Sequence, residues 1–110
     1  MQTSIFKFNS DSISAASMGA DISGTGLDVA EATVIAVHSV WSAGSSPVGF
    51  VLIQASNDGT TYTTIDSQAV SGNTGSLMYK ASDVGYRYIR AAYSRTSGSG
   101  TLTSKISAKG

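Results

Sequence analysis

The chain of 110 residues contains no cysteine, one proline, one histidine and one tryptophan. The lack of cysteine excludes a disulfide scaffold, a thiolate metal site and a cysteine nucleophile. No apolar run approaches the ~20 residues that a membrane-spanning helix needs. The N-terminus has no basic segment followed by an apolar one, so we expect no signal peptide and no transmembrane segment.

Charge is also scarce. Lys and Arg together number seven, Asp and Glu together number seven, and charged residues make up 13% of the chain. A formal charge of zero without a basic cluster argues against nucleic-acid binding through phosphate contacts. A nearly uncharged surface suits a subunit that works inside an assembly, because a freely diffusing monomer usually carries more charge to stay soluble.

Serine, threonine and glycine are abundant, with 20, 11 and 12 residues respectively. Good helix formers are few, so we expect no long helix. Short segments rich in β-branched and aromatic residues alternate with Gly, Ser and Asn turns. This pattern predicts an all-β fold, a compact antiparallel β-sandwich of about six to eight short strands with little or no helix. We expect residues 1–110 to form one such domain.

Two predicted strands, 33–42 and 48–56, are apolar on both faces, which is typical of strands buried on both sides. Asn57, Asp58 and Gly59 form a strong turn signal, because these residues tolerate the positive φ of tight turns. An alternating segment follows at 60–65. Residues 48–65 are therefore predicted to form a β-hairpin.

The C-terminal part predicts a second hairpin, in which strands at 86–93 and 101–108 flank a flexible turn at 97–100. A shorter strand is expected at 75–80, between the two hairpins.

The N-terminal part is less regular. Residues 4–9 are predicted to form an edge strand with Phe6 and Phe8 on one face. The pattern leaves residues 10–32 open between loop and short strand. We expect residues 1–20 to act as an arm or edge strand that reaches a neighbouring molecule and becomes ordered there.

The sequence offers little for catalysis or metal binding. His38, the one imidazole, lies inside a predicted strand, and no motif places a nucleophile or carboxylate beside it. The oxygen-bearing candidates for a hard cation are dispersed and show no Asp-x-Asp spacing; they are Asp11, Asp21, Asp28, Asn57, Asp58, Asp66 and Asp83. We therefore expect no enzyme, no catalytic residue, no metal site and no cofactor.

Arginines and tyrosines alternate near the start of the C-terminal hairpin. Aromatic side chains beside arginine are typical of protein interfaces, and they also occur in sugar and base recognition. We interpret this segment as a protein interface, although a structural role and ligand binding stay open. With the N-terminal phenylalanines, the candidate interface residues are Phe6, Phe8, Tyr86, Arg87, Tyr88, Arg90, Tyr93 and Arg95.

Several segments resemble small virion-associated proteins of tailed bacteriophages. The run PVGFVLIQASNDGTTY at 47–62 resembles their glycine- and SNDG-containing hairpin. The later segments that fit the same pattern are YRYIR at 86–90, Tyr93, SGSGTL at 97–102 and KG at 109–110. The SNDG turn and the RYIR strand also resemble those of discoidin-type β-sandwiches. Two departures stand out, since Tyr62 replaces a common tryptophan and the loop aromatics of discoidin-type domains are missing.

The phage resemblance implies a non-enzymatic virion structural protein, specifically a capsid decoration, cement or head-surface protein. Its implied partners are the major capsid protein or other virion proteins and further copies of itself, with no nucleic acid and no membrane. Such a protein would be made in the host cytoplasm and reside in the virion. The alternative is a carbohydrate- or surface-binding adhesion module of a tail or fibre, which would bind through loops at 21–28, 43–47 and 71–76.

Overall fold

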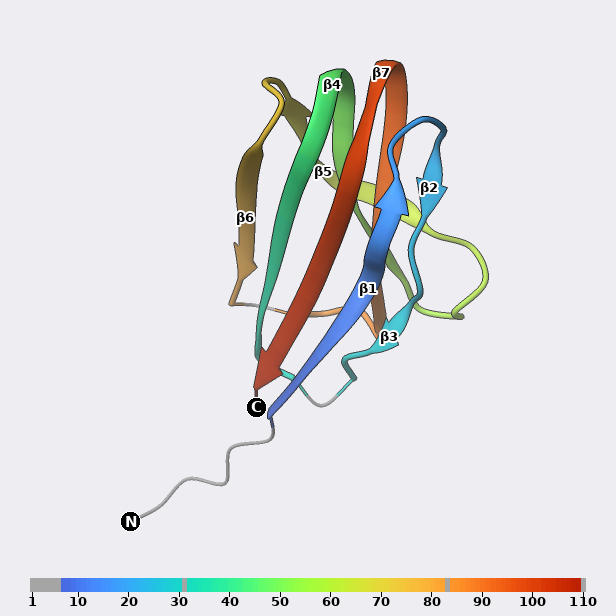
Figure 1. Ribbon diagram of the computed structural model, residues 1–110. Helices are drawn as coiled ribbons and strands as arrows, with labels where there is room; N and C mark the ends of the chain where they lie inside the picture. The colour runs from blue at the N-terminus through green and yellow to red at the C-terminus, as the bar shows by residue number, and fades with distance from the viewer. Residues whose placement is uncertain (1–6, 31, 83, 110) are drawn as a thin grey trace.

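The computed structural model describes residues 7–30, 32–82 and 84–109, and their side chains from residue 10 to residue 108. These residues form an all-β fold of antiparallel strands without a helix, as the sequence predicts (Figure 1). The strands are β1 (Lys7–Ser17), β2 (Ile22–Ser23), β3 (Leu27–Asp28), β4 (Val34–Ser56), β5 (Thr63–Val70), β6 (Gly75–Ala81) and β7 (Tyr88–Lys109).

Two long strands organise the sheet. β4 has 23 residues and β7 has 22, and they pair antiparallel from Val34 opposite Lys109 to Ser56 opposite Tyr88. Both strands curve over at one end of the molecule, so that one hydrogen-bonded sheet folds onto itself as two layers (Figure 1). The first layer holds β1, the C-terminal half of β7, the N-terminal half of β4, and β6. The second holds β2 and β3, the N-terminal half of β7, the C-terminal half of β4, and β5.

This arrangement corrects the predicted strand connections. Residues 33–42 and 48–56 are not separate strands, because they belong to the two halves of β4. The predicted second hairpin is wrong, since each half of β7 pairs with a half of β4 and residues 97–100 lie inside β7. The first hairpin is confirmed as the pairing of β4 with β5, although β5 begins and ends later than the predicted 60–65 segment.

The bend in the two long strands depends on unusual backbone conformations. Ala43 and Ser46 have φ of 53° and 50°, and Gly98 in β7 has φ of 78°. Asn73, in the connection between β5 and β6, braces the bend from the side: its backbone oxygen accepts from the Gly44 N–H at 3.0 Å, and its Oδ1 accepts from the Ser46 N–H at 2.9 Å. The β4 corner is thus fixed by hydrogen bonds to a segment distant in sequence.

The core lies between the two layers. Alternate residues of each long strand point inward, as the two-residue period of a strand requires. In β4, Ile35, Val37 and Trp41 are buried, whereas His38 and Val40 between them are exposed. The prediction that both faces of this segment are buried is therefore wrong, because each layer keeps one face toward solvent. The principal buried apolar residues are Ile13, Met18, Val29, Ile35, Val37, Trp41, Val51, Ile53, Ile89, Tyr93, Leu102 and Ile106.

β1 lies at one edge of the first layer, opposite the edge that β6 forms, and pairs with β7 of the same chain. Its register shifts around Ser12, whose Oγ donates to the Thr25 oxygen at 2.8 Å and accepts from the Ala91 N–H at 3.0 Å. These bonds join the first layer to the second along one side. The predicted strand at 4–9 and the predicted arm at 1–20 extend in part beyond the described residues, which begin at residue 7.

Candidate functional site

The turn after β4 is held by its own side chains. The Asp58 carboxylate accepts from the backbone N–H groups of Thr60 and Thr61 at 2.8 and 2.9 Å, and from the Ser56 hydroxyl at 2.8 Å. Hydrogen bonds to the charged form favour ionisation. They lower the pKa of Asp58 from 3.8 to about 2, with the Thr60 bond as the largest cause. The SNDG sequence therefore has a structural explanation as a turn.

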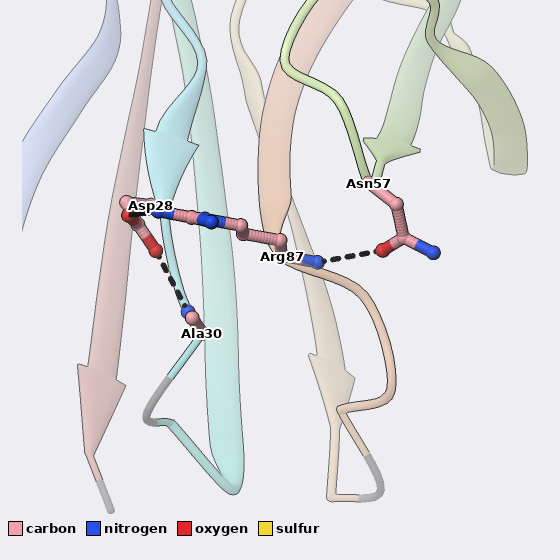
Figure 2. Close-up of polar contacts among 4 residues, drawn as sticks. All are labelled: Asp28, Ala30, Asn57 and Arg87. Carbon is pink, nitrogen blue, oxygen red and sulfur yellow. Dashed lines mark hydrogen bonds and ion pairs between the residues drawn. The ribbon is translucent and has the colours of Figure 1, made fainter.

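The same turn is tied to the start of β7 and to β3, as Figure 2 shows. Asn57 Oδ1 accepts from the Arg87 N–H at 3.0 Å. The Arg87 guanidinium lies 3.4 Å from Asp28 Oδ2, and Asp28 Oδ1 accepts from the Ala30 N–H at 2.9 Å. Arg87 is thus paired with an acid, and both side chains are about half exposed.

Arg90 has a different setting, on the outer face of the second layer. Its Nε donates to Gln54 Oε1 at 2.7 Å, and its guanidinium carbon lies 4.1 Å from the centre of the Tyr62 ring. Gln54 Nε2 in turn donates to Thr64 Oγ1 at 3.1 Å. Side chains from β4, β5, β7 and the segment before β5 therefore meet at one place, which we call the Arg90 cluster: Gln54, Tyr62, Thr64 and Arg90.

The other candidate interface residues are dispersed. Tyr93 points into the core and is 1% exposed, so the prediction that it contacts a partner is wrong. Tyr86 is half-buried, and burial together with the neighbouring Tyr79 raises its pKa above the ordinary 10.0. Arg95 is exposed, with its Nε donating to the Gly98 oxygen at 2.8 Å. Phe6 and the side chain of Phe8 lie outside the described residues.

Tyr88 lies on the outer face of β7, half-buried, with the Arg87 guanidinium carbon 5.3 Å from the centre of its ring. Its ring packs against Gly59 in the turn after β4. The interface as a whole stays a prediction. The structure places Arg87, Tyr88 and Arg90 near one another, Tyr93 in the core, and Arg95 close to the bend.

Both outer faces carry exposed apolar side chains. On the first layer, Val40 of β4 is 41% exposed and Met78 of β6 is 55% exposed. Met78 lies opposite His38, which is itself exposed. On the second layer, Phe50 of β4 is 46% exposed.

Among the residues that the structure describes, no three His, Asp or Glu side chains form a group that could hold a metal ion. Asp83, one of the dispersed candidates, lies outside them. A search of these residues for a long, apolar helix able to cross a membrane finds none.

The loops proposed for surface binding are only partly loops. Residues 21–28 contain β2 and β3, both paired with β7, and residues 43–47 lie within β4 at its bend. The 71–76 segment ends in β6 and contacts the bend through Asn73.

Sequence reasoning did not single out Gln54, Tyr62 or Thr64 as members of a site. Tyr62 and Arg90 are 28 positions apart, and only the pairing of β4 with β7 brings Arg90 beside Gln54. The sequence does place Phe50, Leu52 and Gln54 on one face of a strand. That pattern could have predicted the cluster only if the neighbouring strand, which supplies Arg90, had been known.

Comparison with known proteins identifies a shared fold. No protein-family model and no curated protein matches the chain. Among solved structures, the SPBc2 prophage-derived protein YomS is similar with a TM-score of 0.67 and 18% identity, over 100% of this chain and 98% of that chain. A chain from the disulfide-linked pili of Bacillus endospore appendages is similar with a TM-score of 0.42 and 15% identity, over 96% of this chain and 86% of that chain. The likeness to YomS shows a common fold over the whole chain.

Proposed function

We propose that this protein is a non-enzymatic structural component of a bacteriophage virion, and specifically a capsid decoration or cement protein at the head surface. The observation that carries the proposal is the likeness to prophage-derived YomS, which extends over nearly the full length of both chains. The resemblance of residues 47–62 and 86–102 to virion-associated proteins supports the same class. The partners in this proposal are the major capsid protein and further copies of the chain.

The geometry suits attachment by protein contact. A two-layer sandwich presents two broad faces, and each face carries an exposed large apolar side chain, Met78 on the first and Phe50 on the second. Exposed apolar groups among polar neighbours are typical of protein interaction sites. Hydroxyl-bearing residues surround them: Ser76 and Thr103 flank Val40, and Ser94 lies opposite Phe50.

A protein that binds only the assembled shell stabilises that state by mass action. Contacts repeated over a lattice add avidity, so that each single contact can be weak. A small, nearly uncharged domain with apolar groups on its faces suits such repeated weak contacts, because there is little charge repulsion between neighbouring copies.

The direct test is co-sedimentation of the purified protein with shells from which decoration proteins have been stripped, beside a glycan array. We expect saturable binding to the shells and none to the array. Glycan binding without shell binding would contradict the proposal and favour the adhesion module.

Two variants identify the face that binds. V40S/M78S alters the first outer face and F50S alters the second, while both leave the core unchanged. Loss of shell binding in one variant and not in the other would assign the interface, whereas full binding by both would contradict a role for these apolar groups. Light scattering over a concentration series tests self-association, and a strict monomer at high concentration would contradict the homo-oligomer.

A further inference from the structure

Arg90 is held in one orientation by two different contacts. The hydrogen bond from its Nε to Gln54 Oε1, at 2.7 Å, fixes one edge of the guanidinium. The Tyr62 ring, 4.1 Å from the guanidinium carbon, covers one of its faces. Because an arginine side chain otherwise loses considerable rotamer freedom on binding, such support reduces the entropic cost of a further contact.

The supporting residues are themselves fixed. Gln54 Nε2 donates to Thr64 Oγ1 at 3.1 Å, which orients the amide so that its oxygen faces Arg90. The Tyr62 hydroxyl packs directly against Gly26, where a β-carbon would collide with it. Tyr62 thus extends across Arg90 and ends against the connection between β2 and β3.

The charge of Arg90 has no counter-ion among the described residues, where the ion pairs are Arg87 with Asp28 and Lys105 with Asp11. The Tyr62 ring shields one face of the guanidinium from water, and the residue as a whole is half-buried. The Nε hydrogen bond to Gln54 and the contact with the Tyr62 ring leave the terminal Nη1 and Nη2 groups without a partner among these residues. A partly desolvated cation gains when an anion arrives.

We infer that the Arg90 cluster is a binding site for the side-chain carboxylate of an Asp or Glu on a protein partner. The two terminal nitrogens form a planar fork that matches the two oxygens of a carboxylate. One cation matches one negative charge, whereas a phosphate would call for more positive charge than this cluster supplies.

The surroundings favour a protein partner over a small anion. Phe50, Leu52 and Gln54 alternate on one face of β4, so an exposed phenylalanine lies on the same face as Gln54, four residues along the strand. An exposed aromatic side chain on the same face as an oriented arginine is typical of the anchoring region of a protein interface. The protein nature of the partner rests on the proposed function, while the carboxylate site itself rests on the geometry of Arg90.

The first experiment tests the site without any phage component. The probe is N-acetyl-L-glutamate N-methylamide, which carries one side-chain carboxylate, and its neutral control is the glutamine counterpart. The Nε–H signal of Arg90 is followed by NMR and assigned with the R90K variant. We expect a saturable shift with the glutamate probe and none with the glutamine probe. No shift with the glutamate probe, or equal shifts with both, would overturn the site.

The second experiment tests the source of the carboxylate. In shell co-sedimentation, R90Q is expected to weaken binding by about tenfold or more, as truncation of an anchoring arginine does. R90K keeps the charge but loses the fork and the stacking, so we expect an intermediate loss. K80Q removes an exposed cation from β6 in the other layer. It is the control for a general effect of charge, so a loss that is specific to Arg90 must exceed the loss in K80Q. Thermal unfolding of each variant checks that the fold is intact.

The outcomes separate the two proposals. If the unaltered protein does not bind shells, the proposed function fails, and the glutamate probe still decides the site. If the unaltered protein and R90Q bind shells equally, the protein partner of Arg90 is overturned while the proposed function stands. A shift of Arg90 with D-galacturonate but not with the glutamate probe would assign the site to a sugar acid and overturn the inference.

Discussion

The hydroxyl groups of Ser39 and Ser104 lie 2.8 Å apart in the core, directly opposite each other on β4 and β7. Both residues are almost fully buried, at 1% and 0% exposed. Each hydroxyl satisfies the other, so neither is left without a hydrogen bond among the apolar residues around it. The pair also marks the register in which the two long strands meet.

Loss of either hydroxyl alone should therefore lower the free energy of unfolding by more than half of what the loss of both hydroxyls does. We expect Ser104→Ala to lower the free energy of unfolding by about 1–2 kcal/mol, because Ser39 keeps a buried polar group without its partner. The double variant S39A/S104A should lose less than the sum of the two single variants. Urea unfolding of the four proteins gives the coupling energy. Strictly additive losses would show that the hydroxyls contribute independently.

The identity of the strands was more predictable than their connections. The apolar and β-branched residues of the predicted strands at 33–42, 48–56 and 75–80 do lie in strands, except Thr33, which precedes β4. Between the first two, the segment Ser45, Ser46 and Pro47 has the composition of a loop, yet it continues β4 through a bend. That bend depends on the hydrogen bonds that the Gly44 and Ser46 N–H groups donate to Asn73 and on pairing with β7. No local sequence pattern contains these contacts.

The bend of β7 depends on Gly98. Its φ of 78° is one that residues with a side chain rarely adopt, and a β-carbon there would collide with the backbone oxygen of Ser46 in β4. We expect Gly98→Ala to destabilise the fold by about 1–3 kcal/mol, through backbone strain and loss of close approach. Gly85→Ala is the matched control, because a β-carbon at Gly85 meets nothing within 4 Å and its φ is not left-handed. Thermal unfolding compares the two, and equal midpoints would contradict a special role for Gly98.

The Arg90 cluster could not have been derived from the sequence, although Arg90 itself was singled out. Its supporting groups come from three other segments, and the sequence predicts Tyr62 as part of a strand, whereas it lies just before β5. The inclusion of Tyr93 had a simpler cause. The two-residue period of the strand places Tyr93 and Arg90 on opposite faces, but it does not show which face is buried. The buried face is the one that the other layer covers, and the sequence does not show which one that is.

The turn carboxylate Asp58 predicts an acid-dependent loss of stability. Its pKa is lowered from 3.8 to about 2 in the folded protein, so the folded state binds a proton less readily than the unfolded state. The contribution is therefore present above about pH 4 and is lost as the pH falls toward 2. Asp58→Asn lacks this titration, so the difference in urea midpoint between the two proteins should shrink across that range. A difference that stays constant from pH 5 to pH 2 would contradict the role of the ionised carboxylate.

Tyr93 places a phenol in the core, with its hydroxyl buried and without a hydrogen-bond partner among the described residues. We expect Tyr93→Phe to keep or raise the free energy of unfolding, by up to about 1 kcal/mol, because an unsatisfied polar group is removed. Tyr93→Ala should cost about 3–5 kcal/mol through loss of packing.

Burial raises the pKa of Tyr93 above the ordinary 10.0. The unfolded chain therefore releases this proton first, and the stability that Tyr93 contributes falls as the pH rises past 10. The advantage of Tyr93→Phe in urea unfolding should therefore widen above pH 10. An advantage that stays constant would show that the phenol ionises as readily in the folded state as in the unfolded state.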